Sequence, residues 1–172
     1  MVPILETARL RLRAFRDADI GPWAAAMAGA EVTRYLGGQP FTREETWRRI
    51  LASTGAWAVL GYGYWAIERK AEGDLIGQAG FADFKRAMTP SIEGLPEMGW
   101  VFSPHVHGQG YASEAVGAAL AWADEALNAP HIPAIIDPDN APSIRLAERH
   151  GFAEREPATY RDAPILLFHR RR

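Results

Sequence analysis

Residues 97–115 read EMGWVFSPHVHGQGYASEA, and this segment sets the expected fold of the chain. Its first part, 98–102, is apolar and β-prone, and Pro104 ends the expected strand because proline has no N–H to donate to a sheet. Two glycines follow, and apolar residues at helical spacing begin near Tyr111. The segment therefore predicts a strand, a glycine loop and the start of a helix.

A strand, a glycine loop and a helix N-terminus together suit an anion. Glycine lets a ligand approach the backbone closely, and the first N–H groups of a helix have no intrahelical partner. The helix dipole is positive at that end, so the bound group is most often phosphate. A tight connection that only needs small residues explains the two glycines as well. The segment matches neither the dinucleotide fingerprint nor the P-loop pattern.

Length and composition indicate an ordinary soluble protein. The chain has 172 residues, a net charge of −2 and no cysteine. We expect a single domain over 1–172 and a cytoplasmic location, since no signal peptide and no apolar run near ~20 residues is visible. The charge gives no case for nucleic acid as the main partner. The lack of cysteine excludes disulfides, thiolate metal sites and a cysteine acyl-enzyme.

The first third of the chain predicts one strand and two helices. Residues 7–15 alternate apolar side chains with arginines, which favours a strand whose arginines lie on a solvated or edge face. Asp17 or Asp19 can cap a following helix that carries Trp23, Ala24 and Met27. Thr42 and Glu45 form a capping box for a second helix that we expect to end near Ser53, with Trp47, Ile50 and Leu51 facing inward.

The middle of the chain predicts a hairpin. Residues 62–69 and 75–84 are strand-like and are separated by a polar turn. Gly77 and Gly80 weaken the second strand and indicate a bulge or a close approach of another backbone. A loop over 86–96 then leads into the strand of the opening segment.

The last third predicts a short strand, a helix and a final strand. Residues 132–136 are apolar, and Asn140 is a good N-cap for a helix that ends at His150. Gly151 and Phe152 suit a Schellman motif after that helix. Residues 163–169 read as the last strand, with 153–163 expected as a loop and 170–172 as a solvated tail.

The motifs together resemble those of the GNAT superfamily of N-acetyltransferases. Gly110 and Ala112 match the fourth and sixth positions of the family's Q/R-x-x-G-x-G/A signature, and His107 stands where Gln or Arg is usual. Asn140 and Ser143, followed by Gly-Phe, resemble the second signature. The opening strand and the residues after the loop resemble the branch of ribosomal-protein N-terminal acetyltransferases (RimJ/RimL-like). The resemblance covers essentially the whole chain.

The resemblance implies a mixed α/β (α+β) GNAT-like fold, with a mostly antiparallel sheet flanked by helices on both faces. Its fourth and fifth strands would splay apart to admit acetyl-CoA, the co-substrate, and no metal is implied. The pantetheine arm would pair with the backbone of Trp100, Val101 and Phe102. The residues that would hold the pyrophosphate, or shape the cofactor site around it, are His107, Gly108, Gln109, Gly110, Tyr111, Ala112, Ser113, Asn140 and Ser143.

The chemistry that the resemblance implies is direct acetyl transfer from a thioester to a primary amine through a tetrahedral intermediate. Glu97 is the candidate base, although a surface acid at a strand end would look the same in the sequence. The tyrosine that many members use as an acid is replaced by Ala147, so Ser143 is the candidate donor to the sulfur. Tyr160 could also reach the site from a later loop, but nothing in the sequence places it there. Tyr35, Phe41 and Trp47 either line the acceptor pocket or pack in the core.

Other functions remain open at this point. A catalytically degenerate acyl-CoA sensor or partner-binding module is the alternative to an enzyme. A protein that binds a nucleotide at the glycine loop is a weaker alternative. The pair His105 and His107 could ligate a metal, but no further ligand cluster supports it. The acceptor, either a peptide N-terminus or a small amine, cannot be named. The oligomeric state is open, and the last strand or its edge could build a homodimer.

Overall fold

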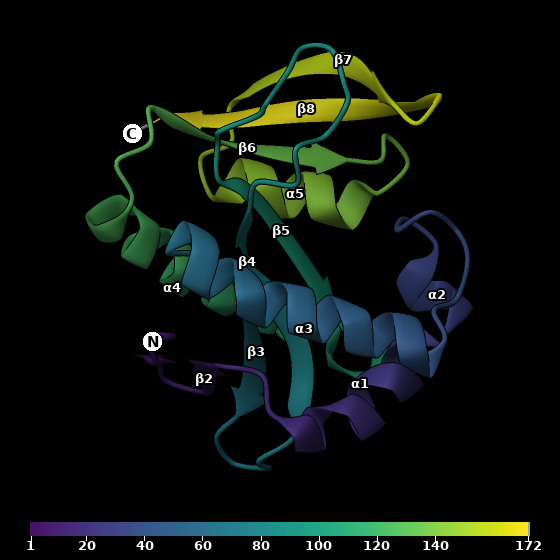
Figure 1. The fold of residues 1–172 in the computed structure, drawn as a ribbon, viewed down its shortest axis with the longest axis vertical. Coiled ribbons are helices and arrows are strands. Elements are labelled where there is room, and N and C mark those ends of the chain that lie inside the picture. Colours follow the sequence, from purple (N-terminus) through teal and green to yellow (C-terminus); the bar gives the residue numbers. More distant parts are fainter. Residues whose placement is uncertain (172) are drawn as a thin grey trace.

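Two antiparallel sheets organise the chain in the computed structural model, which describes residues 1–171 (Figure 1). The first sheet has the order β1-β2-β3-β4-β5, and the second has the order β6-β8-β7. The strands of the first sheet are β1 (Leu5–Glu6), β2 (Leu10–Arg13), β3 (Tyr64–Arg69), β4 (Leu75–Ala82) and β5 (Glu97–Phe102). Those of the second are β6 (His131–Ile136), β7 (Glu154–Tyr160) and β8 (Ala163–Arg171).

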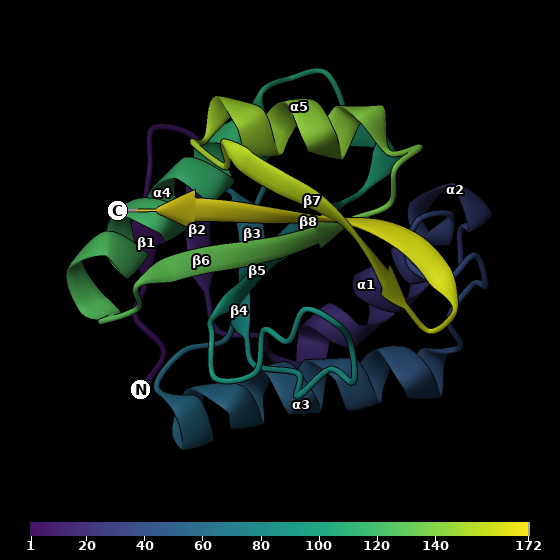
Figure 2. The same cartoon turned by 90° about the horizontal axis from the view of Figure 1, so that it is seen from above.

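Helices cover both faces of the first sheet. The helices are α1 (Ile20–Met27), α2 (Ala30–Thr33), α3 (Arg43–Leu60), α4 (Tyr111–Ala126) and α5 (Ala141–Arg149), with short 3-10 helices η1 (Asp17–Asp19) and η2 (Pro104–Val106). In Figure 1, α3 passes in front of the sheet and α4 behind it. The larger core cluster joins α4 to the sheet, while a smaller one joins α1 and α3 to its other face. Figure 2 shows β8 between β6 and β7, with α5 alongside.

The predicted parting of two strands is present. The fourth and fifth strands expected from the sequence are β5 and β6, which are neighbours, yet no strand pairing joins them within residues 1–171. All pairings inside the two sheets are antiparallel. One edge of β5 is therefore left without a partner strand.

Several local predictions are confirmed by the backbone. The Thr42–Glu45 capping box opens α3, and Asn140 caps α5 by accepting a hydrogen bond from the N–H of Ser143. Gly151 has φ +84°, and the N–H groups of Gly151 and Phe152 donate to the carbonyls of Glu148 and Ala147. This double contact is the Schellman motif that the sequence predicted. The apolar stripe of α4 is buried from Ala115 to Ala123.

The predicted end of the second helix is wrong. The helix α3 continues through Gly55 to Leu60, and Gly61, at φ +79°, ends it. Trp57, in the last turns of α3, is buried and donates from Nε1 to the carbonyl of Tyr64. These contacts outweigh the free-energy cost of having Gly55 inside a helix. Leu51, expected inside, is 51% exposed.

Two predictions near the C-terminus are also wrong. Residues 154–160 form the strand β7, although a loop was expected, because β8 supplies a partner along their whole length. The strand β8 extends to Arg171, so residues 170 and 171 are not a solvated tail. Arg170 pairs with Asp124, and Arg171 pairs with Glu154. Arg172 lies outside the described residues.

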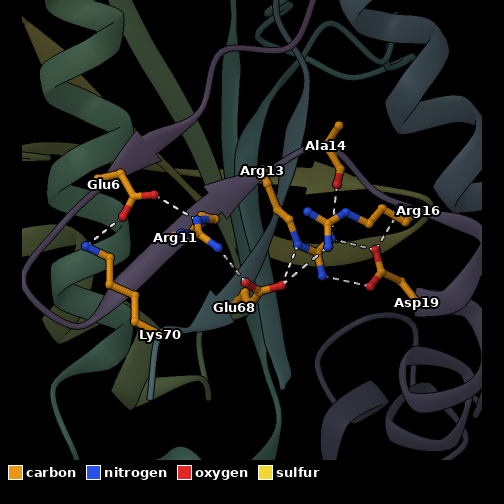
Figure 3. A network of polar contacts seen from close by, with 8 residues as sticks. All are labelled: Glu6, Arg11, Arg13, Ala14, Arg16, Asp19, Glu68 and Lys70. Carbon is orange, nitrogen blue, oxygen red and sulfur yellow. Dashed lines mark hydrogen bonds and ion pairs between the residues drawn. The ribbon is translucent and has the colours of Figure 1, made fainter. Parts of the chain in front are cut away.

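The expectation that all three arginines of the first strand are solvated fails for Arg13. Arg13 is 4% exposed, and its side chain bonds both oxygens of Asp19, at 2.7 and 2.9 Å, and Oε2 of Glu68 at 2.7 Å (Figure 3). The Asp19 carboxylate also accepts from the Arg16 N–H at the start of η1. Asp19 stands at the N-cap position of α1, but its side chain does not bond that helix as predicted. The carboxylate instead joins the buried ion pair that holds β2 against η1 and β3. Within residues 1–171, no helix has the length and apolar character needed to cross a membrane.

Candidate active site

Six consecutive backbone N–H groups at the start of α4 lack a protein acceptor. They belong to residues 108–113, and none of them donates a hydrogen bond within residues 1–171. Gly108 and Gly110 have φ values of +75° and +81°, which a residue with a side chain adopts only under strain. These N–H groups lie at the positive end of the helix dipole and have no protein acceptor, so the segment can bind an anion.

The cradle, which we define as residues 108–113, is held in place from both sides. His107 donates from Nε2 to the carbonyl of Phe102, at 3.1 Å, and so ties the loop to the end of β5. Arg9 donates to the carbonyl of Gln109, at 2.9 Å, and its guanidinium lies 4.2 Å from the centre of the Tyr111 ring. Arg9 also bonds Glu114, in the first turn of α4. These contacts hold the loop in place without a ligand. The sequence did not reveal the role of Arg9.

Ser113, the last residue of the cradle, contacts α5. Its hydroxyl lies 2.9 Å from Nε2 of His150, the residue that ends that helix. Burial and the neighbouring arginines Arg149 and Arg170 lower the pKa of His150. The neutral imidazole therefore joins the first turn of α4 to the end of α5 at neutral pH.

The unpaired edge of β5 runs towards the cradle. The N–H of Ser103 donates to the carbonyl of Ile76, so the ladder directs the backbone groups of odd-numbered residues in β5 towards β4. The even-numbered residues Met98, Trp100 and Phe102 direct theirs to the open edge. Of the three residues expected to pair with an extended ligand, Trp100 is therefore available. Phe102 also faces the open edge, but its carbonyl accepts from His107. Val101 directs its backbone groups to Gln78 instead.

Ser143 joins the start of α5 to β5. Its hydroxyl oxygen accepts a hydrogen bond from Nε1 of Trp100 at 3.2 Å. The Ser143 hydroxyl hydrogen has no acceptor within residues 1–171, so it is free for a ligand on the open edge of β5. Ala147, where a family tyrosine would stand, is fully buried in the core.

Glu97 begins β5 and is only 4% exposed. Arg86 binds both of its carboxylate oxygens, at 2.6 and 2.9 Å. Burial raises the pKa of Glu97 above its ordinary value, and the Arg86 guanidinium opposes only part of that rise. The Arg86 guanidinium also lies 4.7 Å from the centre of the Tyr160 ring. The sequence singled out Glu97 but not its partner, because the loop that carries Arg86 has no recognisable pattern.

A row of three residues crosses the sheet beside Glu97. Tyr64 in β3 pairs with Gly80 in β4, and Gly80 pairs with Gly99 in β5. A Cβ on Gly99 would lie 2.2 Å from the Tyr64 hydroxyl oxygen. The Tyr64 ring therefore extends over Gly80 and brings its hydroxyl against β5, two residues from Glu97 and on the same face. The predicted close approach at Gly80 is confirmed, since a Cβ there would collide with the backbone of Gly63 and Tyr64.

The residues expected to wall an acceptor pocket have different surroundings. The Tyr35 hydroxyl donates to the carbonyl of Asp139, at 3.2 Å, and so links the segment after α2 to the loop before α5. Phe41 and Trp47 pack, partly buried, against the smaller core cluster. The two histidines of the H-x-H pair diverge: His105 lies 3.8 Å from Asp74, whereas His107 faces β5.

Known acetyltransferases resemble this chain in sequence and in fold. Residues 9–153 match the family model described as the acetyltransferase (GNAT) domain. The uncharacterized N-acetyltransferase YoaA of Bacillus subtilis (strain 168) is 32% identical over 153 residues, covering 88% of this chain and 84% of YoaA. An acetyltransferase from Agrobacterium tumefaciens str. C58, known from a crystal structure, has 30% sequence identity and a TM-score of 0.84. The alignment covers 100% of this chain and 96% of the Agrobacterium chain.

A more distant structure shares the fold. RimL, a ribosomal L7/L12 alpha-N-protein acetyltransferase solved in complex with coenzyme A, has a TM-score of 0.75 and 17% identity, and each chain is covered to 98%. The family match spans most of the chain, so the protein belongs to the GNAT acetyltransferase family. Its class is that of the acetyl-CoA-dependent N-acetyltransferases.

Proposed function

We propose that this protein transfers the acetyl group of acetyl-CoA directly to a primary amine, and that the whole chain forms one cytoplasmic domain for this purpose. The observation that carries the proposal is the row of six unpaired N–H groups at residues 108–113, next to the unpaired edge of β5. One extended ligand with a pyrophosphate at one end and amide groups along its length would satisfy both. Coenzyme A has that shape, and RimL is described as binding it in a related fold.

The residues assigned to acetyl-CoA follow from this arrangement. The pyrophosphate would lie on the cradle, whose Arg9 and His107 contacts keep its amides in place. The pantetheine arm would pair with the backbone of Trp100 along the open edge of β5. The thioester sulfur would then come within reach of Ser143, whose free hydroxyl hydrogen can stabilise the departing thiolate.

The amine would be activated by Glu97. As the nitrogen forms its bond to the thioester carbon, the carbonyl electrons move to oxygen and the nitrogen loses a proton. Glu97 would take up that proton, for which its raised pKa suits it better than an ordinary glutamate. Collapse of the tetrahedral intermediate then breaks the C–S bond and releases the thiolate of CoA. The peptide N-terminus and the small-molecule amine both remain acceptor classes for this reaction.

The test combines binding and turnover. Titration calorimetry with acetyl-CoA, with ATP as the control nucleotide, should show binding of acetyl-CoA alone. A thiol-release assay with short peptides and with diamines should then identify an acceptor. Glu97→Gln should lower kcat by about 100-fold or more, while Glu93→Gln, an exposed acid in the adjacent loop, should leave it unchanged.

Two outcomes would contradict the proposal in different ways. Acetyl-CoA binding without transfer to any amine would favour the alternative of an acyl-CoA sensor or partner-binding module. No binding of acetyl-CoA would mean that the glycine loop is only a tight turn.

A further inference from the structure

The Tyr64 hydroxyl is a polar group for which the fold provides space but no partner. Within residues 1–171 it makes no hydrogen bond, although its ring is packed across the sheet. The space exists because the two residues beside it in the row, Gly80 and Gly99, have no side chains. A methyl group on Gly99 would lie 2.2 Å from the hydroxyl oxygen but 3.2 Å from the ring carbon that bears it, so the missing side chain makes room for the oxygen in particular.

The hydroxyl lies on the face of β5 that Glu97 also occupies. Side chains alternate along a strand, so Glu97, Gly99 and Val101 share one face, while Trp100 points to α5 through its contact with Ser143. An acetyl-CoA on the open edge of β5 would thus have Ser143 on one side and the pair Tyr64 and Glu97 on the other. An amine that gives its proton to Glu97 has to arrive on the Tyr64 side.

We propose that Tyr64 is a catalytic residue that contacts the acceptor amine: its hydroxyl oxygen accepts a hydrogen bond from the nitrogen and orients the nitrogen lone pair towards the thioester carbon. This inference rests on the proposed function and extends it. Tyr64 keeps its own proton throughout, the amine proton goes to Glu97, and the C–S bond breaks when the tetrahedral intermediate collapses. The place of the residue differs from the family's tyrosine position, which Ala147 occupies here.

The electrostatic surroundings agree with a neutral hydroxyl. Burial, with a smaller contribution from the Glu97 carboxylate, raises the pKa of Tyr64, while Arg86 opposes the rise. The phenol therefore stays protonated at neutral pH and does not compete with Glu97 as a base. Phe84, half exposed, lies beside the Tyr64 ring, with ring centres 6.4 Å apart.

The test is Tyr64→Phe, with Tyr62→Phe as the matched control from the same segment. Because the Tyr64 hydroxyl bonds nothing in the protein, we expect an unchanged thermal midpoint and an unchanged dissociation constant for acetyl-CoA. The kcat/KM for the peptide or diamine that the wild type acetylates should fall by about 10- to 100-fold. The pH dependence of the remaining activity should keep its shape, since Glu97 is still the base. Tyr62→Phe should behave as wild type.

A second variant tests the geometry. Gly99→Ala places a methyl group on the hydroxyl, so it should lower kcat/KM by a similar factor. In the Tyr64→Phe background, Gly99→Ala should lower kcat/KM little further, because the hydroxyl is already absent. Full activity of Tyr64→Phe would overturn the inference. So would a loss of acetyl-CoA affinity as large as the loss of kcat/KM. Neither result would contradict the proposed function. If the wild type binds acetyl-CoA but acetylates no amine, the proposed function falls and the inference falls with it.

Discussion

Arg86 holds Glu97 by two hydrogen bonds, from Nε to Oε2 at 2.6 Å and from Nη2 to Oε1 at 2.9 Å. The acid lies at the start of β5, and the arginine lies in the loop before it. The positive charge lowers the pKa of a carboxylate that burial would otherwise raise further. Arg86 therefore sets the pH at which the proposed base becomes protonated.

Replacing Arg86 should move the acid limb of the activity profile. A base works only when deprotonated, so activity falls as the pH drops through the pKa of Glu97. Arg86→Gln removes the opposing charge, raises that pKa, and should shift the acid limb of kcat/KM to higher pH. The pH dependence of acetyl transfer measures this shift. Arg161→Gln, in the β7–β8 turn, is the control and should leave the limb in place. An unmoved limb in Arg86→Gln would show that another group is the base.

The glycines of the cradle should be needed for the cofactor rather than for stability alone. Gly110→Ala forces a side chain into a backbone with φ +81°, at a cost of roughly 1–2 kcal/mol, and the loop can relieve the strain by turning its amides away. Acetyl-CoA binding, measured by calorimetry, should weaken by about 10-fold. Gly73→Ala is the matched control, because Gly73 has φ +70° in the β3–β4 turn. It should lower the thermal midpoint without changing the affinity; equal losses of affinity in both variants would argue against the cradle.

Removing the Ser143 hydroxyl should slow transfer more than it weakens binding. A hydrogen bond to a charged group contributes about 1.5–3 kcal/mol, so Ser143→Ala should lower kcat by about 10- to 100-fold if the serine stabilises the thiolate. The variant also leaves Nε1 of Trp100 without its acceptor, and the tryptophan fluorescence should report that change. Ser143→Thr keeps a hydroxyl and should restore most of the rate. If Ser143→Ala turns over as fast as wild type, the donor is a different group.

The buried arginine of β2 should be a stability determinant. Arg13→Ala removes the buried guanidinium from Asp19 and Glu68. Asp19 keeps the Arg16 N–H and Glu68 keeps its longer contact with Arg11, so the free energy of unfolding should fall by about 3 kcal/mol. Urea denaturation measures this loss. Arg11→Ala is the comparison. The Arg11 side chain is 42% exposed and its contact with Glu68 is longer, at 3.3 Å, so its loss should change the stability by about 1 kcal/mol or less. Similar results for the two variants would mean that solvent reaches the network more freely than its burial indicates.

The sequence alone determined the features that depend on neighbours along the chain. The capping box at Thr42, the Schellman motif at Gly151 and the apolar stripe of α4 each involve residues within one or two helical turns. The cradle is of the same kind, because the glycines and the first turn of α4 are adjacent in the chain. For that reason the residues at the proposed pyrophosphate site could be named in advance.

Only the tertiary structure decided the features that join distant segments. The strand β7 has mainly exposed side chains and contains Pro157, so no apolar alternation revealed it, and it exists because β8 pairs with it. The burial of Arg13 depends on Glu68, fifty-five residues away. The placing of Tyr64 over Gly99 depends on the register of three strands. Pairing and register are set by which segments bury each other, and that information is not local in the sequence.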